Sequence, residues 1–481
     1  MIPMGVITYN TGPPVVNSFK FQITTTAINE VFTLPILAGG ASYTQNFTIT
    51  WGDTTSSEIT AYNDPDAAHT YAVAGTYDVE MIGTCQYLSF YSATAANRNK
   101  VKKLLAVSGD IGFKLLNFYN CANLNTLIPL GTMSSLLNAN GGISGVGLFQ
   151  NCTSITSIPS GIFDGCSAIT DFSYAFYGCL NAALTSIPAD LFKYNIKVTT
   201  FEQTFAACQK LVSVPADLFK YNTKVITFYR TFYLCQSLTT IGSGIFDGGI
   251  LVTTFQQTFQ GCALLTAIPD HLFDYNTAVT TFQNTFSTCS AITSIPTDLF
   301  KYNIAATTFF GTFFNCSGLT SIPSGLFDTN ILVNTFASTF SGCNKITVIV
   351  ADLFKYNTGV TTFANTFQNC SVLATIPADL FRYNTLALTF TSTFNACVKM
   401  QQRIDIFYPV GESGTRFLDK SVIFTNCFTR TSFTGTQGTA PDLWNCNFGS
   451  GTPTKTNCYS GAGNSITSLT NYADIPTVWK S

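Results

Sequence analysis

Cysteine recurs at a fixed interval of 27 residues through the middle of this chain. Self-similarity at a constant period of this length is typical of a solenoid, in which each repeat is one coil that packs only on its neighbours. The chain is therefore expected to present a long surface of stacked coils rather than one central pocket. The recurring positions are Cys208, Cys235, Cys262, Cys289, Cys316, Cys343, Cys370 and Cys397.

Three phenylalanine positions share this period and hold the same residue in all eight repeats. The first column runs over residues 192–381, the second over 201–390 and the third over 205–394, and they account for most of the 43 phenylalanines. Each aromatic side chain buries roughly 150–250 Å². We therefore expect the rings of neighbouring coils to pack on one another and to form the core.

The consensus of one repeat, L-T-x-I-P-x-D-L-F-K-Y-N-x-x-V-T-T-F-x-x-T-F-x-x-C-x-x, predicts a mainly β coil. L-T-S-I should form a short strand that proline ends, because proline cannot donate to a ladder. A-D-L-F-K-Y-N is expected to form a short helical or 3₁₀ turn, with Asp as a cap near its start and Asn at its end. V-T-T-F is rich in β-branched residues and should form a second short strand.

Degenerate copies extend the array toward the N-terminus. Phe172, Phe176 and Cys179 match the consensus, and frayed copies precede them. Residues 100–400 are therefore assigned to the solenoid. The period then stops, and residues 401–481 are expected to be a C-terminal cap, since an open solenoid end exposes both core and sheet edge.

The recurring Cys and Thr positions are interpreted as interior. Buried free thiols that pack as small apolar groups are expected, with disulfides between adjacent coils as the alternative, which a cytoplasmic origin disfavours. A metal site is not expected, since each coil supplies one Cys with no His beside it. Threonine precedes the second and third phenylalanine in all eight repeats. These hydroxyls should bond between coils, with a threonine-lined ligand face as the alternative.

Residues 21–95 do not follow the period, and their short alternating segments predict a β-sandwich. Three segments, W-G-D at 51–53, H-T-Y at 69–71 and G-T-Y-D-V at 75–79, resemble the W-x-x-G-D, H-x-Y and G-x-Y-x-V pattern of the PKD family of Ig-like domains, with a shorter Trp-to-Gly spacing. The resemblance implies a spacer or adhesive module, in which His69 makes a structural hydrogen bond.

The repeats resemble the BspA-type leucine-rich repeats, also described as the mycoplasma lipoprotein-associated repeat. The shared element is F-x-x-C-x-x-L-x-x-I-P, and the resemblance covers residues 115–400. Members of this family are surface adhesins of bacteria and protists, and phage virion proteins of host-binding type. One copy comprises Phe286, Cys289, Ile292, Ile295 and Pro296.

Residues 1–20, treated as an N-terminal arm, lack a basic region followed by a long apolar run, so no secretory signal is expected. No stretch of about 18 apolar residues predicts membrane insertion. The net charge of −2, with 10% charged residues, gives no reason to expect nucleic-acid binding.

The family usually carries an export signal on cells, so the sequence favours a phage virion protein of tail-fibre or receptor-binding type, assembled in the host cytoplasm. A bacterial cell-surface adhesin and a purely structural virion connector are the alternatives. The expected partners are other virion proteins and a host surface glycan or protein, within an oligomer.

Neither an enzyme activity nor a cofactor is expected, because His69 and His271 stand outside any zinc spacing. The recurring Asp could mimic the paired carboxylates of a glycosidase, but one capping Asp per coil explains it better. The exposed K-Y-N column is the best candidate surface, unless Tyr only covers the turn and Lys is solvated. The candidate binding residues are Tyr194, Tyr221, Tyr275, Tyr302, Tyr356, Tyr383, Lys193, Lys220, Lys301, Lys355 and Arg382.

Overall fold

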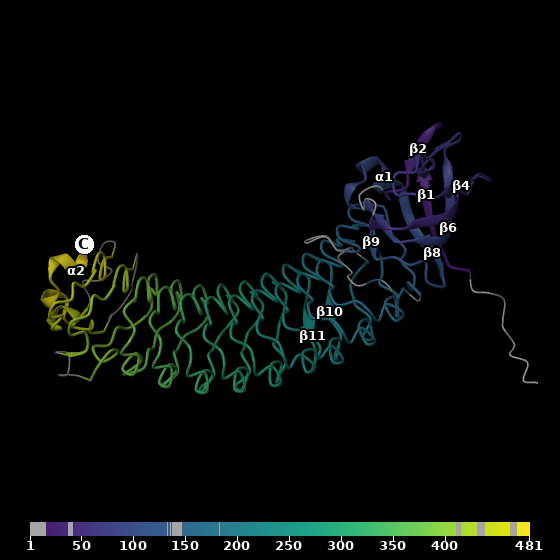
Figure 1. Cartoon of the computed structure of the whole chain (residues 1–481). Coiled ribbons are helices and arrows are strands. Elements are labelled where there is room, and N and C mark those ends of the chain that lie inside the picture. Colours follow the sequence, from purple (N-terminus) through teal and green to yellow (C-terminus); the bar gives the residue numbers. More distant parts are fainter. Residues whose placement is uncertain are drawn as a thin grey trace, which may run out of the picture.

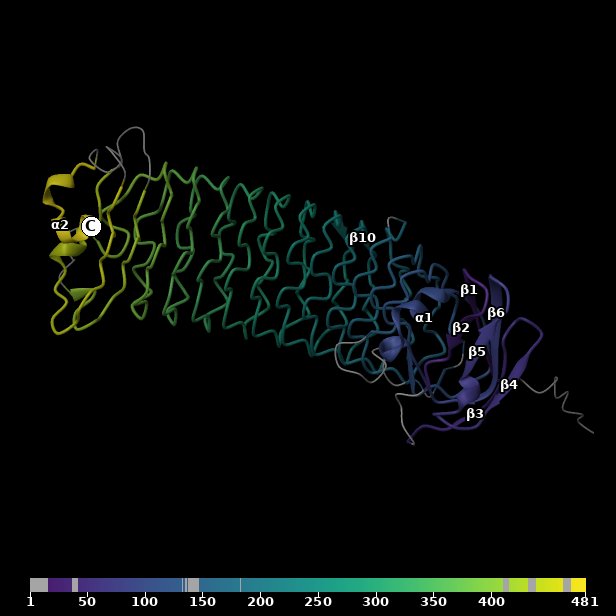
Figure 2. The same cartoon turned by 90° about the horizontal axis from the view of Figure 1, so that it is seen from above.

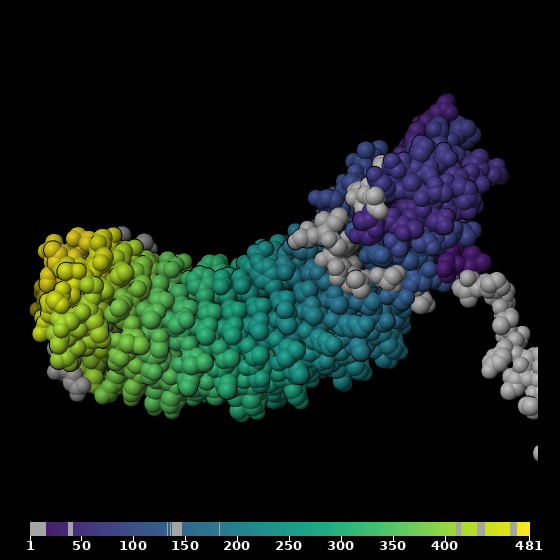
Figure 3. Space-filling view, viewed as in Figure 1, coloured from purple at the N-terminus to yellow at the C-terminus, as the bar shows by residue number. Residues whose placement is uncertain are grey.

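The chain folds into an arched row of coils with a sheet region at its N-terminal end (Figure 1). Seen from above, the coils follow one another in single file (Figure 2). The space-filling view shows one curved body, concave above and convex below (Figure 3). The expected repeat solenoid is therefore confirmed. The computed structural model describes residues 16–36, 42–131, 133–134, 136, 147–181, 183–409, 415–430, 438–461 and 469–481, so most of the expected arm lies outside the described residues.

The N-terminal region consists of two antiparallel sheets, one with strand order β4-β3-β6-β1-β8 and one that pairs β2 with β5. The ring of Phe21 in the larger sheet lies 6.1 Å from that of Phe32 in the smaller, and both are fully buried. Two packed sheets agree with the expected sandwich, while the Ig-like family stays a prediction. The strands are β1 (Ser18–Thr25), β2 (Glu30–Thr33), β3 (Gln45–Thr50), β4 (Ser56–Ile59), β5 (Ala68–Tyr71), β6 (Gly75–Cys85) and β8 (Val101–Ser108).

The motif residues of the N-terminal region meet in one cluster. His69 Nε2 lies 2.7 Å from Asp53 Oδ2, and the imidazole stacks on the Trp51 ring at 4.9 Å. The Tyr71 hydroxyl donates to the Trp51 carbonyl at 2.9 Å. Gly52 has φ +85°, and a Cβ there would stand 2.7 Å from the Asp78 carbonyl oxygen, so this close approach needs glycine. The expected structural role of His69 is confirmed.

The sheet region and the solenoid overlap in sequence, which corrects the expected boundary at residues 95–100. Strand β8 belongs to the five-stranded sheet, so that sheet extends to Ser108. The parallel pair of β7 (Tyr87–Ser89) and β9 (Leu115–Asn117) already joins two coils, and the Phe90 ring stacks on Phe118 at 5.5 Å. Short helices lie nearby: η2 (Pro65–Ala67), η3 (Phe90–Ser92) and α1 (Ala95–Lys100).

Neighbouring coils are joined by one parallel bridge per step, at the threonine before the second phenylalanine. This ladder runs from Asp171 through Thr200 and onward to Thr389. Every second N–H of the F-x-x-T-F-x-x-C segment then donates to the next coil, but residues such as Gln203, with φ 52°, are left-handed. The expected V-T-T-F strand is therefore wrong in extent: the segment forms one bridge per step, and the left-handed residue two positions after its phenylalanine prevents the strand from continuing.

The L-T-S-I segments were expected to form a strand in every coil. In the described coils they pair as strands at one step, and a single bridge joins Val348 to Thr375 at another. The strand pair is β10 (Ser213–Val214) with β11 (Thr240–Ile241). There the Gly242 N–H donates to the Val214 carbonyl at 2.9 Å. Most other repeats carry proline at that position and lack the donor, so the residue expected to end the strand also prevents its pairing.

The D-L-F-K-Y-N segment forms two successive turns, each closed by a hydrogen bond between residues three apart, so the expected 3₁₀-type turn is present while a continuous helix is not. In one coil the Lys220 N–H donates to the Asp217 carbonyl at 3.0 Å, and the Asn222 N–H donates to the Phe219 carbonyl at 3.0 Å. Asp217 itself is left-handed, with φ 58°, which prevents a continuous helix through this segment.

One column of stacked rings runs through the length of the molecule. It follows the third phenylalanine, and its centroids are 5.2–5.8 Å apart at every step. The predicted aromatic core is therefore confirmed, and it extends beyond the predicted array at both ends. Its members are Phe90, Phe118, Phe149, Phe176, Phe205, Phe232, Phe259, Phe286, Phe313, Phe340, Phe367, Phe394, Phe428 and Tyr459.

Buried polar side chains form ladders beside the rings. The thiol of Cys289 donates to the Phe259 carbonyl of the preceding coil at 3.1 Å, and the Thr285 hydroxyl donates to the Phe255 carbonyl at 3.0 Å. All sixteen cysteines are free and buried. The interior interpretation is thus confirmed for the thiols and for the threonine before the third phenylalanine.

The coils continue past residue 400 with longer steps, which corrects the expected cap. The rings of Phe424 and Phe428 stack on the second and third columns, and Tyr459 stacks on Phe428 at 5.2 Å. The steps from residue 394 to 428 and on to 459 are 34 and 31 residues long. Trp479 then covers the last rings, 6.0 Å from Phe424. The remaining elements are η5 (Leu443–Asn445), η6 (Tyr472–Asp474) and α2 (Thr477–Lys480).

Candidate binding surface

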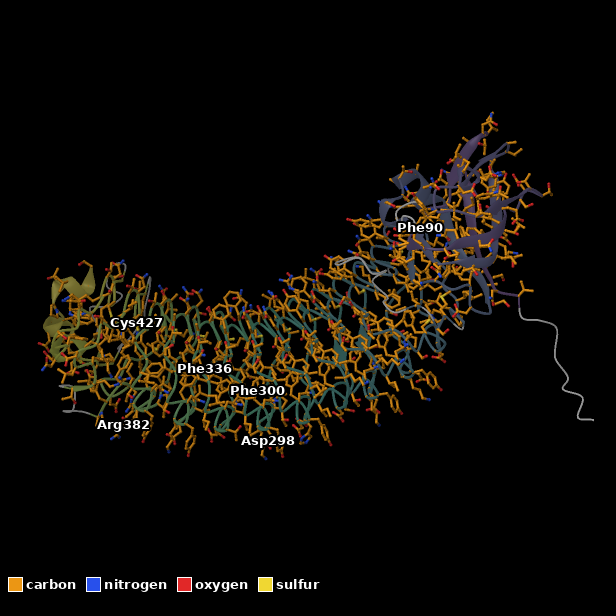
Figure 4. The ribbon with its side chains drawn as sticks, viewed as in Figure 1. Phe90, Asp298, Phe300, Phe336, Arg382 and Cys427 are labelled. Carbon is orange, nitrogen blue, oxygen red and sulfur yellow. The ribbon has the colours of Figure 1, made fainter. Side chains whose placement is uncertain are left out.

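The predicted binding residues lie on the convex side of the arch. Figure 4 labels Asp298 and Arg382, from two D-L-F-K-Y-N turns, at the lower convex margin. The spacing of the rings agrees with this placement. From Phe192 to Phe381 the ring centroids of the first column are 5.7–6.4 Å apart. From Phe205 to Phe394 the ring centroids of the third column are only 5.6–5.8 Å apart. Wider spacing marks the outer side of a curved stack.

The six predicted tyrosines are all exposed, by 41–58%, and cations lie beside four of their rings, those of Tyr194, Tyr302, Tyr356 and Tyr383. Lys193 Nζ is 5.3 Å from the centroid of Tyr194. Lys355 Nζ lies 5.7 Å from Tyr356 in its own coil and 6.0 Å from Tyr383 in the next. Because a cation over an aromatic face is attracted to the ring, these lysines hold the tyrosines in defined positions.

An ion pair fixes most of the cations from the other side. Asp298 Oδ2 lies 3.2 Å from Lys301 Nζ, three residues later, and this hydrogen bond raises the pKa of Lys301. The repeated Asp therefore pairs with the cation of the same turn, which corrects its expected role as a backbone cap. The same pair recurs in three further coils, as Asp217–Lys220, Asp352–Lys355 and Asp379–Arg382.

The coil of His271 reverses the ion pair. Asp274 stands where the other coils have lysine, and His271 stands where they have aspartate, with Nδ1 and Oδ2 2.8 Å apart. His271 is exposed. It is thus the surface variant that the sequence predicted.

Asparagine of the K-Y-N triplet does not belong to the exposed surface. Asn303 is fully buried, and its Nδ2 donates to the carbonyls of Phe273 and Asn276 in the preceding coil at 3.0 and 2.9 Å. Equivalent bonds recur from Asn195 to Asn384. The asparagine ladder therefore anchors the turn under each tyrosine, and the sequence grouping of all three residues as exposed was wrong.

Two coils have Gly248 and Thr329 at the tyrosine position, and each exposes a pair of aliphatic residues two and three positions later. These are Ile250–Leu251 and Ile331–Leu332, each residue between 50% and 58% exposed. Sequence reasoning missed them because it followed one residue type. The convex stripe is therefore unbroken over eight coils, and it comprises Tyr194, Tyr221, Ile250, Leu251, Tyr275, Tyr302, Ile331, Leu332, Tyr356 and Tyr383.

A separate groove of about 650 Å³ lies in the sheet region between β2 and α1, and Val31, Leu34 and Ala96 contribute to its lining. At its edge Lys100 is buried and lies 2.7 Å from Glu30, and this hydrogen bond is the main reason that the pKa of Glu30 falls to about 2. The pair joins α1 to β2, so its role in the described contacts is structural.

Metal and membrane sites were searched among the described residues. There, no group of three or more His, Cys, Asp or Glu side chains is placed to hold a metal ion. No helix within the described segments has the length and apolarity required to cross a bilayer.

Comparison with known proteins finds no matching family model and no matching curated protein. Among solved structures, the Toll–Spätzle complex of Drosophila aligns with a TM-score of 0.29 and 13% identity, over 66% of this chain and 50% of that chain. A leucine-rich-repeat protein from Bacteroides ovatus aligns with a TM-score of 0.15 and 14% identity, over 63% and 82%. The TLR13–ssRNA13 complex aligns with a TM-score of 0.14 and 11% identity, over 50% of each chain.

This chain spans about half the length of the Toll chain that it matches. The description of the molecule as a repeat solenoid rests on its own coil geometry: one bridge per step and continuous ring columns.

Proposed function

We propose that this chain is a non-enzymatic binding protein that uses the convex stripe to hold a protein partner. The observation that carries the proposal is that every coil of the stripe exposes large apolar groups. In the two coils where Gly248 and Thr329 stand at the tyrosine position, the exposed groups are Ile250–Leu251 and Ile331–Leu332, two and three positions later. Contiguous exposed apolar surface of this kind marks interaction sites. Tyrosine adds anchors that lose little conformational entropy on binding.

The interior supports this role because it makes the stripe a fixed template. Stacked rings, threonine bonds and the asparagine ladder hold each turn in register with the next. A partner therefore meets contacts already in place and bears less ordering cost.

The biological setting that we propose is a phage virion, in which the chain is a tail-fibre or receptor-binding component in an oligomer. The BspA-like repeat and the PKD-like motifs support it by resemblance. On this proposal the stripe binds a neighbouring virion subunit or a host surface molecule. A bacterial cell-surface adhesin and a purely structural virion connector are the alternatives.

The setting is tested by mass spectrometry of purified virions and of surface-shaved host cells, with a search for peptides of this chain. Peptides in virions support the phage proposal. Peptides only on cells contradict it and favour the adhesin.

The stripe is tested by quantifying the virion and host-surface proteins retained by the immobilised full chain. The double variant Tyr275→Ala/Tyr302→Ala should lower retention at least tenfold. Tyr91→Ala is the matched control, since Tyr91 is 46% exposed but lies in η3, outside the stripe. Equal retention by both variants would contradict the proposed role of the stripe.

A further inference from the structure

The concave side of the arch carries a second surface with a different chemistry. It is formed by the F-x-x-T-F-x-x-C segment, which contains the closely spaced third ring column. In each of eight coils the second residue after the second phenylalanine is left-handed, from Gln203 to Ser392, with φ between 52° and 60°. Because the backbone is the same in every coil, only the side chains distinguish one coil from another here.

Side chains at these concave positions change along the array. In the N-terminal coils they include large aromatic, amide and guanidinium side chains. Tyr174, Tyr177, Tyr229, Arg230, Tyr233 and Gln257 together define the concave cluster. The coil of residues 309–316 still carries Phe310 and Phe314 at these positions, and from residue 337 onward the positions hold small or polar residues such as Ala337, Ser338 and Ser341. The core does not require the large residues, because the C-terminal coils stack with the same geometry without them.

Arg230 is held at the centre of the cluster. Its guanidinium carbon lies 4.9 Å from the ring centroid of Tyr229 and 5.0 Å from that of Tyr233. Its Nε donates to Gln257 Oε1 at 2.8 Å, and Gln257 Nε2 donates to Gln260 at 2.6 Å. Among the described residues only Nε of this guanidinium donates a hydrogen bond, so its terminal Nη groups remain available to a ligand.

A neighbouring coil extends the same arrangement. Gln203 Nε2 donates to the Tyr174 hydroxyl at 2.8 Å, and the Tyr174 and Tyr177 rings lie 5.9 Å apart. Glutamine continues the concave positions beyond the cluster, at Gln256 and Gln283. Ring faces and edges thus alternate with amide and guanidinium groups along several coils.

We propose that the concave cluster binds an oligosaccharide. Amide and guanidinium groups form paired hydrogen bonds with neighbouring hydroxyls, and tyrosine rings offer an apolar face with a polar tip to the C–H face of a sugar. Charge at these positions is sparse, with Glu202 and Arg230 as the ionised side chains from Tyr174 to Asn284. This favours an uncharged polyhydroxylated ligand over a protein, for which the convex stripe, with its exposed Tyr, Ile and Leu, is better suited.

The proposed glycan binding by the concave cluster does not depend on the virion setting or on the convex stripe. The probe is a printed array of defined neutral and acidic oligosaccharides, incubated with the labelled full chain. We expect the wild-type protein to bind at least one neutral glycan. The variants Arg230→Ala and Tyr229→Ala/Tyr233→Ala should each lower that binding at least tenfold, and Arg230→Lys should restore only part of it because it lacks the planar donors.

Two matched controls separate this surface from the rest. Ser338→Ala/Ser341→Ala alters the same positions in a C-terminal coil, and Tyr302→Ala alters the convex stripe, so both should retain full glycan binding. Circular dichroism melts show whether each variant is folded. Absence of binding by the wild-type protein to every glycan would overturn the proposal. Binding by Arg230→Ala and by Tyr229→Ala/Tyr233→Ala at the wild-type level would also overturn it, as would an equally large loss in the Ser338→Ala/Ser341→Ala control. Neither outcome would affect the proposed role of the convex stripe.

Discussion

The interior of the coil array and its two edges follow different rules. Inside, the same residue types recur at Phe, Thr, Asn and Cys positions, because each packs on or bonds to its copy in the next coil. At the edges the residues change from coil to coil, as in Tyr302 and Thr329 on the convex side, while the backbone stays constant. The comparison teaches that repetition here serves stability, whereas recognition is to be sought where repetition breaks.

The largest expected effect concerns the interior and is a loss of folding stability at alkaline pH. Burial raises the pKa of every cysteine above the ordinary value of 9.0, as for Cys289. Because the pKa of each thiol is higher in the folded than in the unfolded state, the contribution of the thiols to the free energy of unfolding is fully present below pH 9. It is lost as pH rises above this value, by about 1.4 kcal/mol per thiol and pH unit. The chain should therefore unfold cooperatively between pH 9 and pH 11 in reducing buffer, as followed by circular dichroism.

A cysteine variant tests whether the thiols cause this pH-dependent unfolding. Cys289→Ala removes one titrating group, so the loss of stability with pH should become shallower by one thiol's contribution. A urea midpoint that stays constant from pH 8 to pH 10.5 would contradict the role of the thiols.

The next largest effect compares a buried and an exposed phenylalanine. The Phe300 ring lies 4.7 Å from both Phe282 and Phe309 in the core (Figure 4), whereas Phe310 is 39% exposed at the concave edge. Phe300→Ala should lower the free energy of unfolding by about 3–5 kcal/mol, because it leaves a cavity. Phe310→Ala should change it by less than about 0.5 kcal/mol. Urea unfolding checks both, and similar losses would break the distinction between core and edge.

The smallest effect compares two neighbours in sequence. Asn303→Ala leaves the buried carbonyls of Phe273 and Asn276 without their side-chain donor and should cost about 1–3 kcal/mol. Tyr302→Ala, one residue earlier, should leave the urea midpoint unchanged within error. If Tyr302→Ala destabilised the chain as much as Asn303→Ala, the tyrosine would be a structural cover, as the alternative interpretation held.

The sequence predicts the ring columns, the buried thiols and the exposed tyrosines, because their cause is strict repetition of one residue type. It did not predict the final coils, since their steps of 34 and 31 residues hide the register in which Phe424 and Phe428 continue the columns. The burial of Asn303 was missed because its polarity suggested solvent, whereas two carbonyls of the preceding coil require it.

The binding surfaces were predicted only in part. The tyrosines of the convex stripe were found from their period, but Ile250 and Leu251 stand two and three positions after the tyrosine position and so escape a search for one residue type at one position. The concave cluster, centred on Arg230, escaped for the opposite reason: it is a local exception within positions that otherwise hold unremarkable polar residues. Whether either surface binds a ligand depends on contacts outside the chain, which periodicity does not encode.

The unbroken column from Phe90 to Tyr459 has a consequence for how such a chain changes over time. Since each 27-residue unit presents the same faces to the units on either side, recombination can duplicate or delete one unit without disturbing either terminus. Each such event changes the reach of the arch by about 5 Å and shifts the concave cluster relative to the C-terminal end. The ring column thus makes length itself an inheritable, stepwise variable, separate from the choice of residues on the edges.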